Sequence, residues 1–289
     1  MDRKGIILAG GKGTRLYPTT KALPKCLLPV YDKPMIYYSV STLMLAGIRE
    51  ILVITTPIDK ERVKVLLGDG KQWGIDIVYQ IQDQPNGIAD ALIIAEEFLD
   101  NHPCALMLGD NIFYGSALQS KLTRAYLSKN NTIFAYEVPD PERFGICELN
   151  NEGKVISIEE KPSNPISNLC VTGLYFYDEH ASEIASSIAP SPRGELEITD
   201  VNIVYMKQEN LFAEILDQEY TWVDAGTVES FLEASLFVSS IEQEKHIKIS
   251  CPEEIAFNSK WINKDKVKMI AEDLSSSPYS DYLLKIIKN

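Results

Sequence analysis

The sequence lacks the features that would place the protein in a membrane or on a polyanion. No stretch approaches the roughly 18 uninterrupted apolar residues of a membrane span. Basic residues are outnumbered, with 28 Lys and Arg against 41 Asp and Glu, and the formal net charge is −13. Non-specific binding of nucleic acid or anionic lipid needs a basic face, so both classes are disfavoured. An anionic small molecule needs only a local cluster of positive charge and stays compatible with this composition.

Cysteine and histidine are too few and too scattered to indicate a disulfide framework or a zinc site. The cysteines stand at positions 26, 104, 147, 170 and 251, and the histidines at 102, 180 and 246. None of them pairs at metal-ligand spacing. The N-terminal residues run directly into a strand-like segment without a signal-peptide cleavage site. We therefore expect a reducing, cytoplasmic location.

The first half of the 289-residue chain alternates short β-branched apolar runs with helical patterns. Strands are predicted at residues 5–9, 50–55, 75–80, 104–108 and 132–138, and helices at 35–46, 60–67, 88–99 and 118–128. Nearly continuous apolar strands between helices indicate a mainly parallel sheet covered on both faces. The predicted fold class is α/β, a Rossmann-like three-layer sandwich with a mainly parallel central sheet.

The pattern changes near residue 144. Strands are predicted at 144–149, 154–160 and 170–177, helices at 179–188, 197–208 and 228–242, and a further helical segment from 251. No low-complexity linker or internal repeat separates these segments. We expect a single domain over residues 1–289, in which the change near residue 140 is a change of role on one sheet.

The densest functional signal is a glycine-rich loop, LAGGKGTRL, at residues 8–16. Its glycines let the backbone approach a ligand and aim N–H groups at an anion. It is not a Walker A loop, because Gly13 follows Lys12 where Ser or Thr is needed. It does not open a long helix as a Rossmann fingerprint does, because Pro18 follows closely. The pattern favours a phosphate-cradling loop with Arg15 as a bidentate donor, and a tight turn without a ligand is the alternative.

A cluster of cations overlaps this loop and continues into KALPKCLLPV at residues 21–30. Two prolines stiffen that extended segment and leave Lys25 at a defined place between them. With Lys12, Arg15 and Lys21, it puts four cations into fourteen residues of an acidic chain. The pairing with a glycine loop favours a triphosphate site, and a solvated basic patch is the alternative.

Two aspartates follow strand-like runs at distant points of the chain. Asp110 comes directly after the predicted strand 104–108, and Asp224 follows Trp222 and Val223. Ligands of α/β sheets bind at the carboxyl ends of the strands, where a carboxylate is well placed to hold Mg²⁺. Two such groups at one site could grip a cation that bridges phosphates. For Asp110 the alternative is the N-cap of a following helix.

Three further segments carry polar groups of uncertain role. The loop QDQPNG at residues 82–87 could hydrogen-bond a pyrimidine through its amides, although such a loop is more often a plain turn. Glu160 and Lys161 could bind sugar hydroxyls and a phosphate, or form an ordinary surface ion pair. Arg193 precedes a predicted helix, where a structural role and phosphate binding are both open.

Assembled in order, these segments resemble the bacterial glucose-1-phosphate thymidylyltransferases, within the sugar nucleotidyltransferases. The likeness extends over nearly the whole chain and rests on residues 5–18, 31–38, 108–115, 159–162, 171–177, 193–200 and 250–257. The glycine loop is common to the superfamily, whereas Tyr114-Gly115 and the segment CPEEIAF at 251–257 are narrower signals. The resemblance implies the sugar-nucleotidyltransferase fold, with a nucleotide-binding part at 1–143, a sugar-phosphate-binding part at 144–227 and a C-terminal helical segment at 228–289 for assembly or regulation.

The resemblance also implies a reaction and a set of site residues. A phosphate oxygen of glucose 1-phosphate attacks the α-phosphorus of dTTP in line, giving dTDP-glucose and pyrophosphate, with catalysis by positioning and charge neutralisation. Arg15, Lys25 and Asp110 would be catalytic, and Asp110 and Asp224 would hold Mg²⁺. The nucleotide would be bound by Leu8, Gly10, Gly11, Gly13, Thr14, Gln82, Pro85 and Gly87. The sugar phosphate would be bound by Gly145, Glu160, Lys161, Gly173 and Arg193. The family is usually a homotetramer with feedback inhibition at a second site between subunits.

The sequence departs from the family pattern at a few positions. Cys26 and Asp90 each stand where Gln is usual, and KALPK at residues 21–25 is closer to bacterial UTP–glucose-1-phosphate uridylyltransferases, so a uridylyltransferase is the alternative enzyme. Ser116 and Ala117 replace the usual His-Asp near the expected regulatory site.

A third possibility is a non-catalytic sugar-nucleotide sensor on the same scaffold. Such a protein should have lost a metal ligand or a phosphate-binding cation. Arg15, Lys25, Asp110 and Asp224 are all present, which disfavours this reading.

Overall fold

A computed structural model describes residues 2–288 of the chain. Its centre is a nine-stranded sheet in which four of the five strands predicted in the first half lie side by side in the order β6-β1-β4-β5. These four strands are parallel and match the predicted runs closely: β1 (Lys4–Leu8), β4 (Glu50–Thr55), β5 (Asp76–Ile81) and β6 (Cys104–Leu108). They are almost entirely buried along β1, β4 and β6, as expected for strands covered on both faces.

The remaining strands extend the same sheet. The long strand β11 (Leu169–Tyr177) pairs antiparallel with β6 and, on its other edge, with β8 (Asn131–Glu137), which pairs in parallel with β12 (Leu211–Leu216). A hairpin of β9 (Gly145–Leu149) and β10 (Val155–Glu160) completes it. Only β11 and β10 run against the common direction, so the prediction of a mainly parallel sheet is confirmed. Strand β12 was not predicted.

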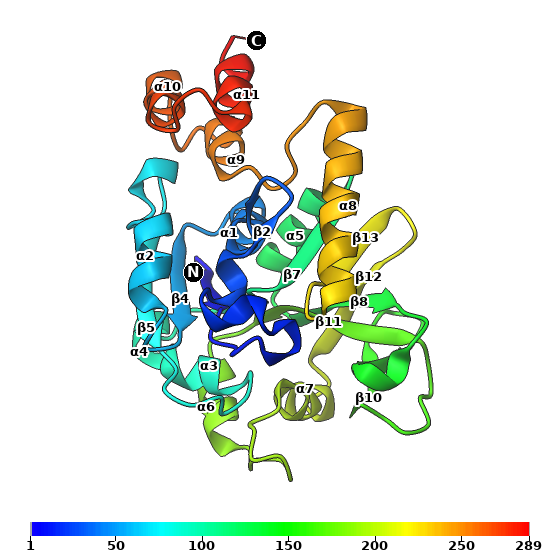
Figure 1. The fold of residues 1–289 in the computed structure, drawn as a ribbon. Helices are drawn as coiled ribbons and strands as arrows, with labels where there is room; N and C mark the ends of the chain where they lie inside the picture. Colours follow the sequence, from blue (N-terminus) through cyan, green and yellow to red (C-terminus); the bar gives the residue numbers. More distant parts are fainter. Residues whose placement is uncertain (1, 289) are drawn as a thin grey trace.

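Helices cover the sheet in two layers with separate hydrophobic cores. On one face pack α1 (Ile36–Leu45), α2 (Lys60–Leu67) and α5 (Leu118–Leu127). On the other face pack α3 (Asp90–Ile94), α4 (Glu96–Leu99), α6 (Ala181–Ser187) and α7 (Ile198–Lys207). The segment 88–99, predicted as one helix, is divided at Ala95 into α3 and α4. The three-layer α/β fold is otherwise as predicted, with α3, α6 and α7 together at the bottom of Figure 1.

The C-terminal part is helical, as predicted. The long helix α8 (Val228–Lys245) begins at a capping box, in which the Thr227 side chain accepts from the Ser230 backbone N–H. Three shorter helices follow at the opposite end of the molecule from α7: α9 (Pro252–Asn258), α10 (Lys264–Asp273) and α11 (Pro278–Ile286) (Figure 1).

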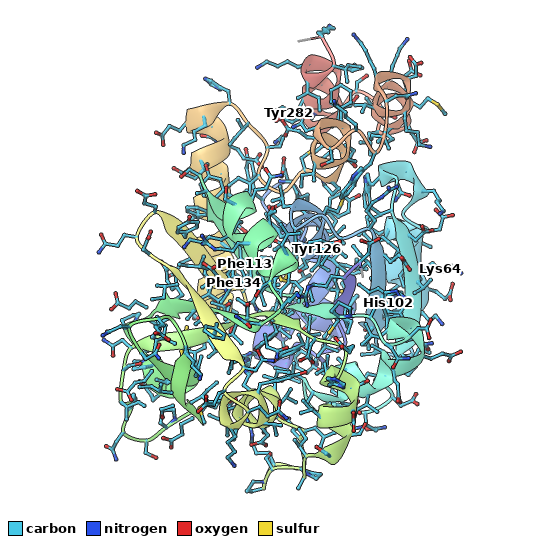
Figure 2. The ribbon with its side chains drawn as sticks, turned by 180° about the vertical axis from the view of Figure 1, so that it is seen from behind. Lys64, His102, Phe113, Tyr126, Phe134 and Tyr282 are labelled. Atoms are coloured by element: carbon cyan, nitrogen blue, oxygen red, sulfur yellow. The ribbon has the colours of Figure 1, made fainter. Side chains whose placement is uncertain are left out.

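Buried and half-buried polar contacts join these helices to the rest of the molecule and to one another. Trp73 Nε1 donates to the carboxylate of buried Glu253 at 2.9 Å. Tyr282 of α11, labelled in Figure 2, donates to Glu254 Oε2 at 2.7 Å.

All five cysteines are free and buried. Within residues 2–288, no helix combines the length and the apolar character needed to cross a membrane.

Candidate active site

A cavity of about 360 Å³ opens at the carboxyl ends of β1 and β6. It forms because β11 changes partner along one edge. β11 pairs with β9 at Cys170 and with β6 from Leu174 onward, so residues 171–173 lie between those two strands and line the cavity. Residues at the end of β6 and at the start of β9, from the two halves of the chain, therefore line one cavity.

Ten of the residues predicted for the site line this cavity: Leu8, Gly11, Arg15, Lys25, Asp110, Gly145, Glu160, Lys161, Gly173 and Asp224. The glycine loop leads into it from β1 and opens no long helix, only a single 3₁₀ turn over Thr14–Leu16. Of the four cations predicted to gather there, Arg15 and Lys25 line the cavity, whereas Lys12 and Lys21 do not.

The other predicted residues lie beside the cavity or away from it: Gly10, Gly13, Thr14, Gln82, Pro85, Gly87 and Arg193. Gly10 adjoins the side chain of Gln82, because a Cβ built on Gly10 would lie 3.4 Å from Gln82 Oε1. Gly87 has φ +109°, and a Cβ there would lie 2.3 Å from the carbonyl oxygen of Leu196. Only glycine fits at that position, so packing against residue 196 accounts for Gly87 without any ligand.

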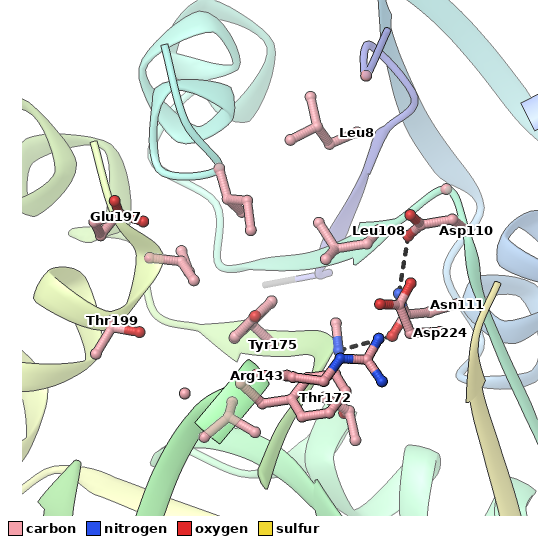
Figure 3. A pocket seen from close by; sticks show the side chains of 18 of the residues that line it. Leu8, Leu108, Asp110, Asn111, Arg143, Thr172, Tyr175, Glu197, Thr199 and Asp224 are labelled. Atoms are coloured by element: carbon pink, nitrogen blue, oxygen red, sulfur yellow. Dashed lines mark hydrogen bonds between the residues drawn. The ribbon is translucent and has the colours of Figure 1, made fainter. Parts of the chain in front are cut away.

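A separate two-stranded sheet explains how the two aspartates meet. β7 (Asn111–Gly115) pairs antiparallel with β13 (Tyr220–Asp224), in a register that places Asp224 opposite Asn111 and so next to Asp110. Figure 3 shows Asp110, Asn111 and Asp224 together on one side of the cavity. The N-cap interpretation of Asp110 is wrong, because a strand that was not predicted, β7, follows it rather than a helix.

The two carboxylates have opposite electrostatic surroundings. Burial alone would raise the pKa of Asp110, but the ion pair with Lys25 and the hydrogen bonds from Lys25 and Asn111 outweigh it, so this pKa is lowered. Burial raises the pKa of Asp224 to about 6, and the charge of Asp110 adds to the shift. Within residues 2–288, no group donates a hydrogen bond to the Asp224 carboxylate. In the described residues Asp224 thus forms no ion pair, and the charges of Lys25, Arg15 and Arg143 only partly offset its burial and the neighbouring carboxylate.

This donor set fits a hard divalent cation. Carboxylate oxygens are preferred ligands of Mg²⁺, which also keeps water and substrate phosphates in its coordination sphere. A cation between Asp110 and Asp224 would remove the repulsion that helps to raise the pKa of Asp224.

The opposite wall carries the predicted sugar-phosphate residues. Glu160 Oε2 accepts a hydrogen bond from Thr199 Oγ1 at 2.6 Å, and Glu160 Oε1 lies 3.4 Å from Lys161 Nζ. Lys161 has φ +46°, a costly conformation for a residue with a side chain, at the point where β10 ends. Figure 3 shows Thr199 and Glu197 on this wall, across the cavity from Asp110.

Arg193 stays outside the cavity because carboxylates hold it. Its Nη2 donates to Glu197 Oε1 at 2.8 Å and lies 3.7 Å from Glu160 Oε1. The hydrogen bond to Glu197 raises the pKa of Arg193 above its usual value, with the charges of the neighbouring carboxylates adding to it. In this arrangement Arg193 is held by carboxylates outside the cavity, and its partner Glu197 lines the cavity.

Comparison with known proteins agrees with this geometry. A family model for nucleotidyl transferases matches residues 4–241. Glucose-1-phosphate thymidylyltransferase from Xanthomonas campestris pv. campestris (strain B100) is 51% identical over 288 residues, 99% of this chain and 98% of the relative. The enzyme of that name from Mycobacterium tuberculosis (strain ATCC 25618 / H37Rv) is 48% identical over 285 residues, 99% of each chain.

The chain belongs to the glucose-1-phosphate thymidylyltransferase family of nucleotidyl transferases. Solved structures agree. A Bacillus anthracis protein described as a glucose-1-phosphate thymidylyltransferase, in complex with a sucrose, is 41% identical with a TM-score of 0.74, over 81% of this chain and 94% of that one. A UDP-glucose pyrophosphorylase complexed with UDP-glucose is 27% identical with a TM-score of 0.73, over 83% and 99%.

In this nucleotidyl transferase, sequence reasoning missed several residues that build the cavity. Buried Asn111 accepts through Oδ1 from Gly173 N at 3.0 Å and from Trp222 Nε1 at 2.6 Å, and so joins β7, β11 and β13. Arg143 lines the cavity and is among the cations that oppose the pKa rise of Asp224. The only signal for Asn111 in the sequence was its position directly after Asp110. Nothing in the sequence indicated Arg143.

Gly226 was also missed. A Cβ built there would lie 2.9 Å from Arg15 Nη2 and 3.0 Å from Asp224 Oδ1. Glycine at this position therefore lets the guanidinium of the glycine loop and the carboxylate of β13 approach the same point.

Proposed function

We propose that this nucleotidyl transferase catalyses attack of glucose 1-phosphate on the α-phosphorus of dTTP, giving dTDP-glucose and pyrophosphate. The relatives that match the whole chain carry the name of this activity. The observation that carries the proposal is the meeting of Asp110, Asp224 and Lys25 at one end of a cavity whose other wall carries Glu160 and Lys161. That arrangement supports binding of two anionic substrates side by side.

Catalysis of such a transfer depends on positioning and on neutralising phosphate charge. Arg15 and Lys25 line the cavity near the glycine loop, where they would bind the α-phosphate and the departing pyrophosphate. Lys25 now pairs with Asp110, so its ammonium is already desolvated and directed at the site. On the opposite wall, Lys161 and Glu160 would hold the phosphate and the hydroxyls of the sugar.

Mg²⁺ is the cofactor that we propose, held by Asp110 and Asp224. When bound, it would offset the charge that develops on the phosphates. The chain's own contribution is to hold the two carboxylates together through the pairing of β7 with β13 and to keep Lys25 beside them.

The base contacts are proposed at the glycine loop, where Gly10 meets Gln82. The relatives of about half identical sequence favour thymine. Uracil is the second candidate, because the KALPK segment is typical of uridylyltransferases and a UDP-glucose pyrophosphorylase shares the fold.

A homotetramer is the proposed assembly. Three exposed apolar side chains on α8 support a subunit contact, because Val228, Leu232 and Leu236 repeat every four residues along one face. Light scattering on the eluting protein measures the assembly directly.

The experiment that tests the proposed function is pyrophosphate release over a grid of nucleoside triphosphates and hexose 1-phosphates, with Mg²⁺ or with EDTA. We expect turnover with glucose 1-phosphate and dTTP, a smaller value with UTP, and none in EDTA. Lys25→Ala should lose at least about a hundredfold in kcat while remaining folded, with a lower unfolding midpoint because Asp110 loses its ion pair. Wild-type turnover in Lys25→Ala, or no turnover with any triphosphate, would contradict the proposal.

A further inference from the structure

The amide of Gln82 is held in one orientation at the edge of the glycine loop. Gln82 follows β5 and is 7% exposed. Its Nε2 donates to Gly87 O at 3.1 Å and to Asp90 Oδ2 at 2.8 Å. A carbonyl and an ionised carboxylate only accept hydrogen bonds, so the amide nitrogen, not the oxygen, must face both.

Both hydrogens of that nitrogen are therefore used, and the oxygen points elsewhere. Gln82 Oε1 lies toward Gly10, whose Cβ would be 3.4 Å away. Within residues 2–288, no donor reaches this oxygen. The oxygen is also not fully enclosed by the protein, so a ligand can reach it. Gln82 thus presents a single open acceptor beside the glycine loop, and no donor.

We propose that Asp90 is a positioning residue for base selection: it engages Gln82 Nε2 and so keeps Oε1 directed at the nucleotide. The inference rests on the proposed function, which places the base at this loop. An acceptor there fits a pyrimidine with an N–H at ring position 3, as in thymine and uracil. Cytosine carries a lone pair at that position and would be repelled. Asp90 acts through Gln82 and does not itself contact the base.

The carboxylate is the group that gives this selection its strength. The carbonyl oxygen of Gly87 accepts one of the two amide hydrogens of Gln82. The charged carboxylate of Asp90 accepts the second, in a stronger hydrogen bond. A neutral amide at position 90 could donate as well as accept, so only the Gly87 carbonyl would then oppose the reversed orientation of Gln82. In that orientation Nε2 would face the base and could donate to N3 of cytosine.

The test compares kcat/KM for dTTP, UTP, dCTP and N3-methyl-dTTP at saturating glucose 1-phosphate. Asp90→Asn removes the charge at constant size, and Asp90→Glu keeps an acceptor-only carboxylate. We expect Asp90→Asn to lower the dTTP:dCTP ratio about five- to tenfold through KM, with kcat nearly unchanged, and to leave the dTTP:UTP ratio as it was. Asp90→Glu should restore the selectivity. N3-methyl-dTTP should be a poor substrate of the wild type, because it lacks the N–H.

A double-mutant cycle with Gln82→Ala separates positioning from a general structural effect. Because Asp90 acts through Gln82, Asp90→Asn should change the ratio no further in the Gln82→Ala background. An unchanged dTTP:dCTP ratio in Asp90→Asn would overturn the inference, as would an equal loss of kcat with both nucleotides or an additive effect in the double variant. Wild type that turns over dCTP but not dTTP, or neither, would instead overturn the proposed function, and this inference with it.

Discussion

Replacing Asp224 by Asn should stabilise the metal-free protein while abolishing its activity. In the folded chain, burial and the charge of Asp110 raise the pKa of Asp224 from 3.8 to about 6. Above pH 6 the ionised carboxylate therefore costs stability that a neutral amide of the same shape does not. At 1.36 kcal/mol per pKa unit, the difference is about 3 kcal/mol at most. Partial solvent access lowers this, and we expect a gain of about 1–2 kcal/mol at pH 7.5.

The sign of the pH dependence distinguishes this cause from others. The cost is fully present above the folded pKa of about 6, shrinks as the pH falls, and is gone below about 3.8, where Asp224 is neutral in the unfolded chain too. The gain from Asp224→Asn should thus fall to about a third of its pH 7.5 value at pH 4.5.

Urea unfolding in EDTA at pH 7.5 and pH 4.5 measures the effect. The control is Glu152→Gln, which removes one charge from an exposed turn and should change stability little. Asp224→Asn should release no pyrophosphate in the presence of Mg²⁺. A variant that is no more stable than wild type at pH 7.5, or that gains equally at both pH values, would refute the reasoning.

Three other substitutions probe separate parts of the cavity. Thr199→Val removes the hydroxyl that donates to Glu160, and should raise the KM for glucose 1-phosphate about three- to tenfold in initial-rate assays, with the KM for dTTP unchanged; equal changes in both would contradict the assignment of that wall. Gly226→Ala places a methyl group 2.9 Å from Arg15 Nη2 and should lower kcat at least about tenfold, and unaltered kcat would show that this close approach is unimportant. Asn111→Leu leaves two buried N–H donors unpaired and should lower the free energy of unfolding in urea by about 2–4 kcal/mol. A loss below about 1 kcal/mol, roughly one hydrogen bond, would contradict this prediction.

The periodicity of the sequence predicted most of the fold because the sheet is buried on both faces. Apolar runs such as those of β1, β4 and β6 have no other location in a globular protein. β7 and β12 were missed because neither is a long apolar run buried on both faces. β7 has only three apolar residues between Asn111 and Gly115, and Glu214 interrupts β12, so their strand character depends on the partners β13 and β8.

The site was predictable where its residues are adjacent in sequence and unpredictable where pairing brings them together. The glycine loop, Lys25 and Asp110 stand out by composition and by their position after strands. Asp224 reaches Asp110 only through the register of β7 with β13, which no local pattern specifies. Arg193 shows the converse: the family resemblance implied a ligand role, but three nearby carboxylates hold it outside the cavity.

The fate of labelled phosphates tests the central claim most directly, that the cavity supports nucleotidyl rather than phosphoryl transfer. The protein is incubated with Mg²⁺, glucose 1-phosphate and dTTP that is radiolabelled at either the α- or the γ-phosphorus. The α-label is expected in the sugar nucleotide and the γ-label in pyrophosphate, and Lys25→Ala should produce neither product. Transfer of the γ-label to the sugar, or release of the α-label as dTMP, would contradict the account.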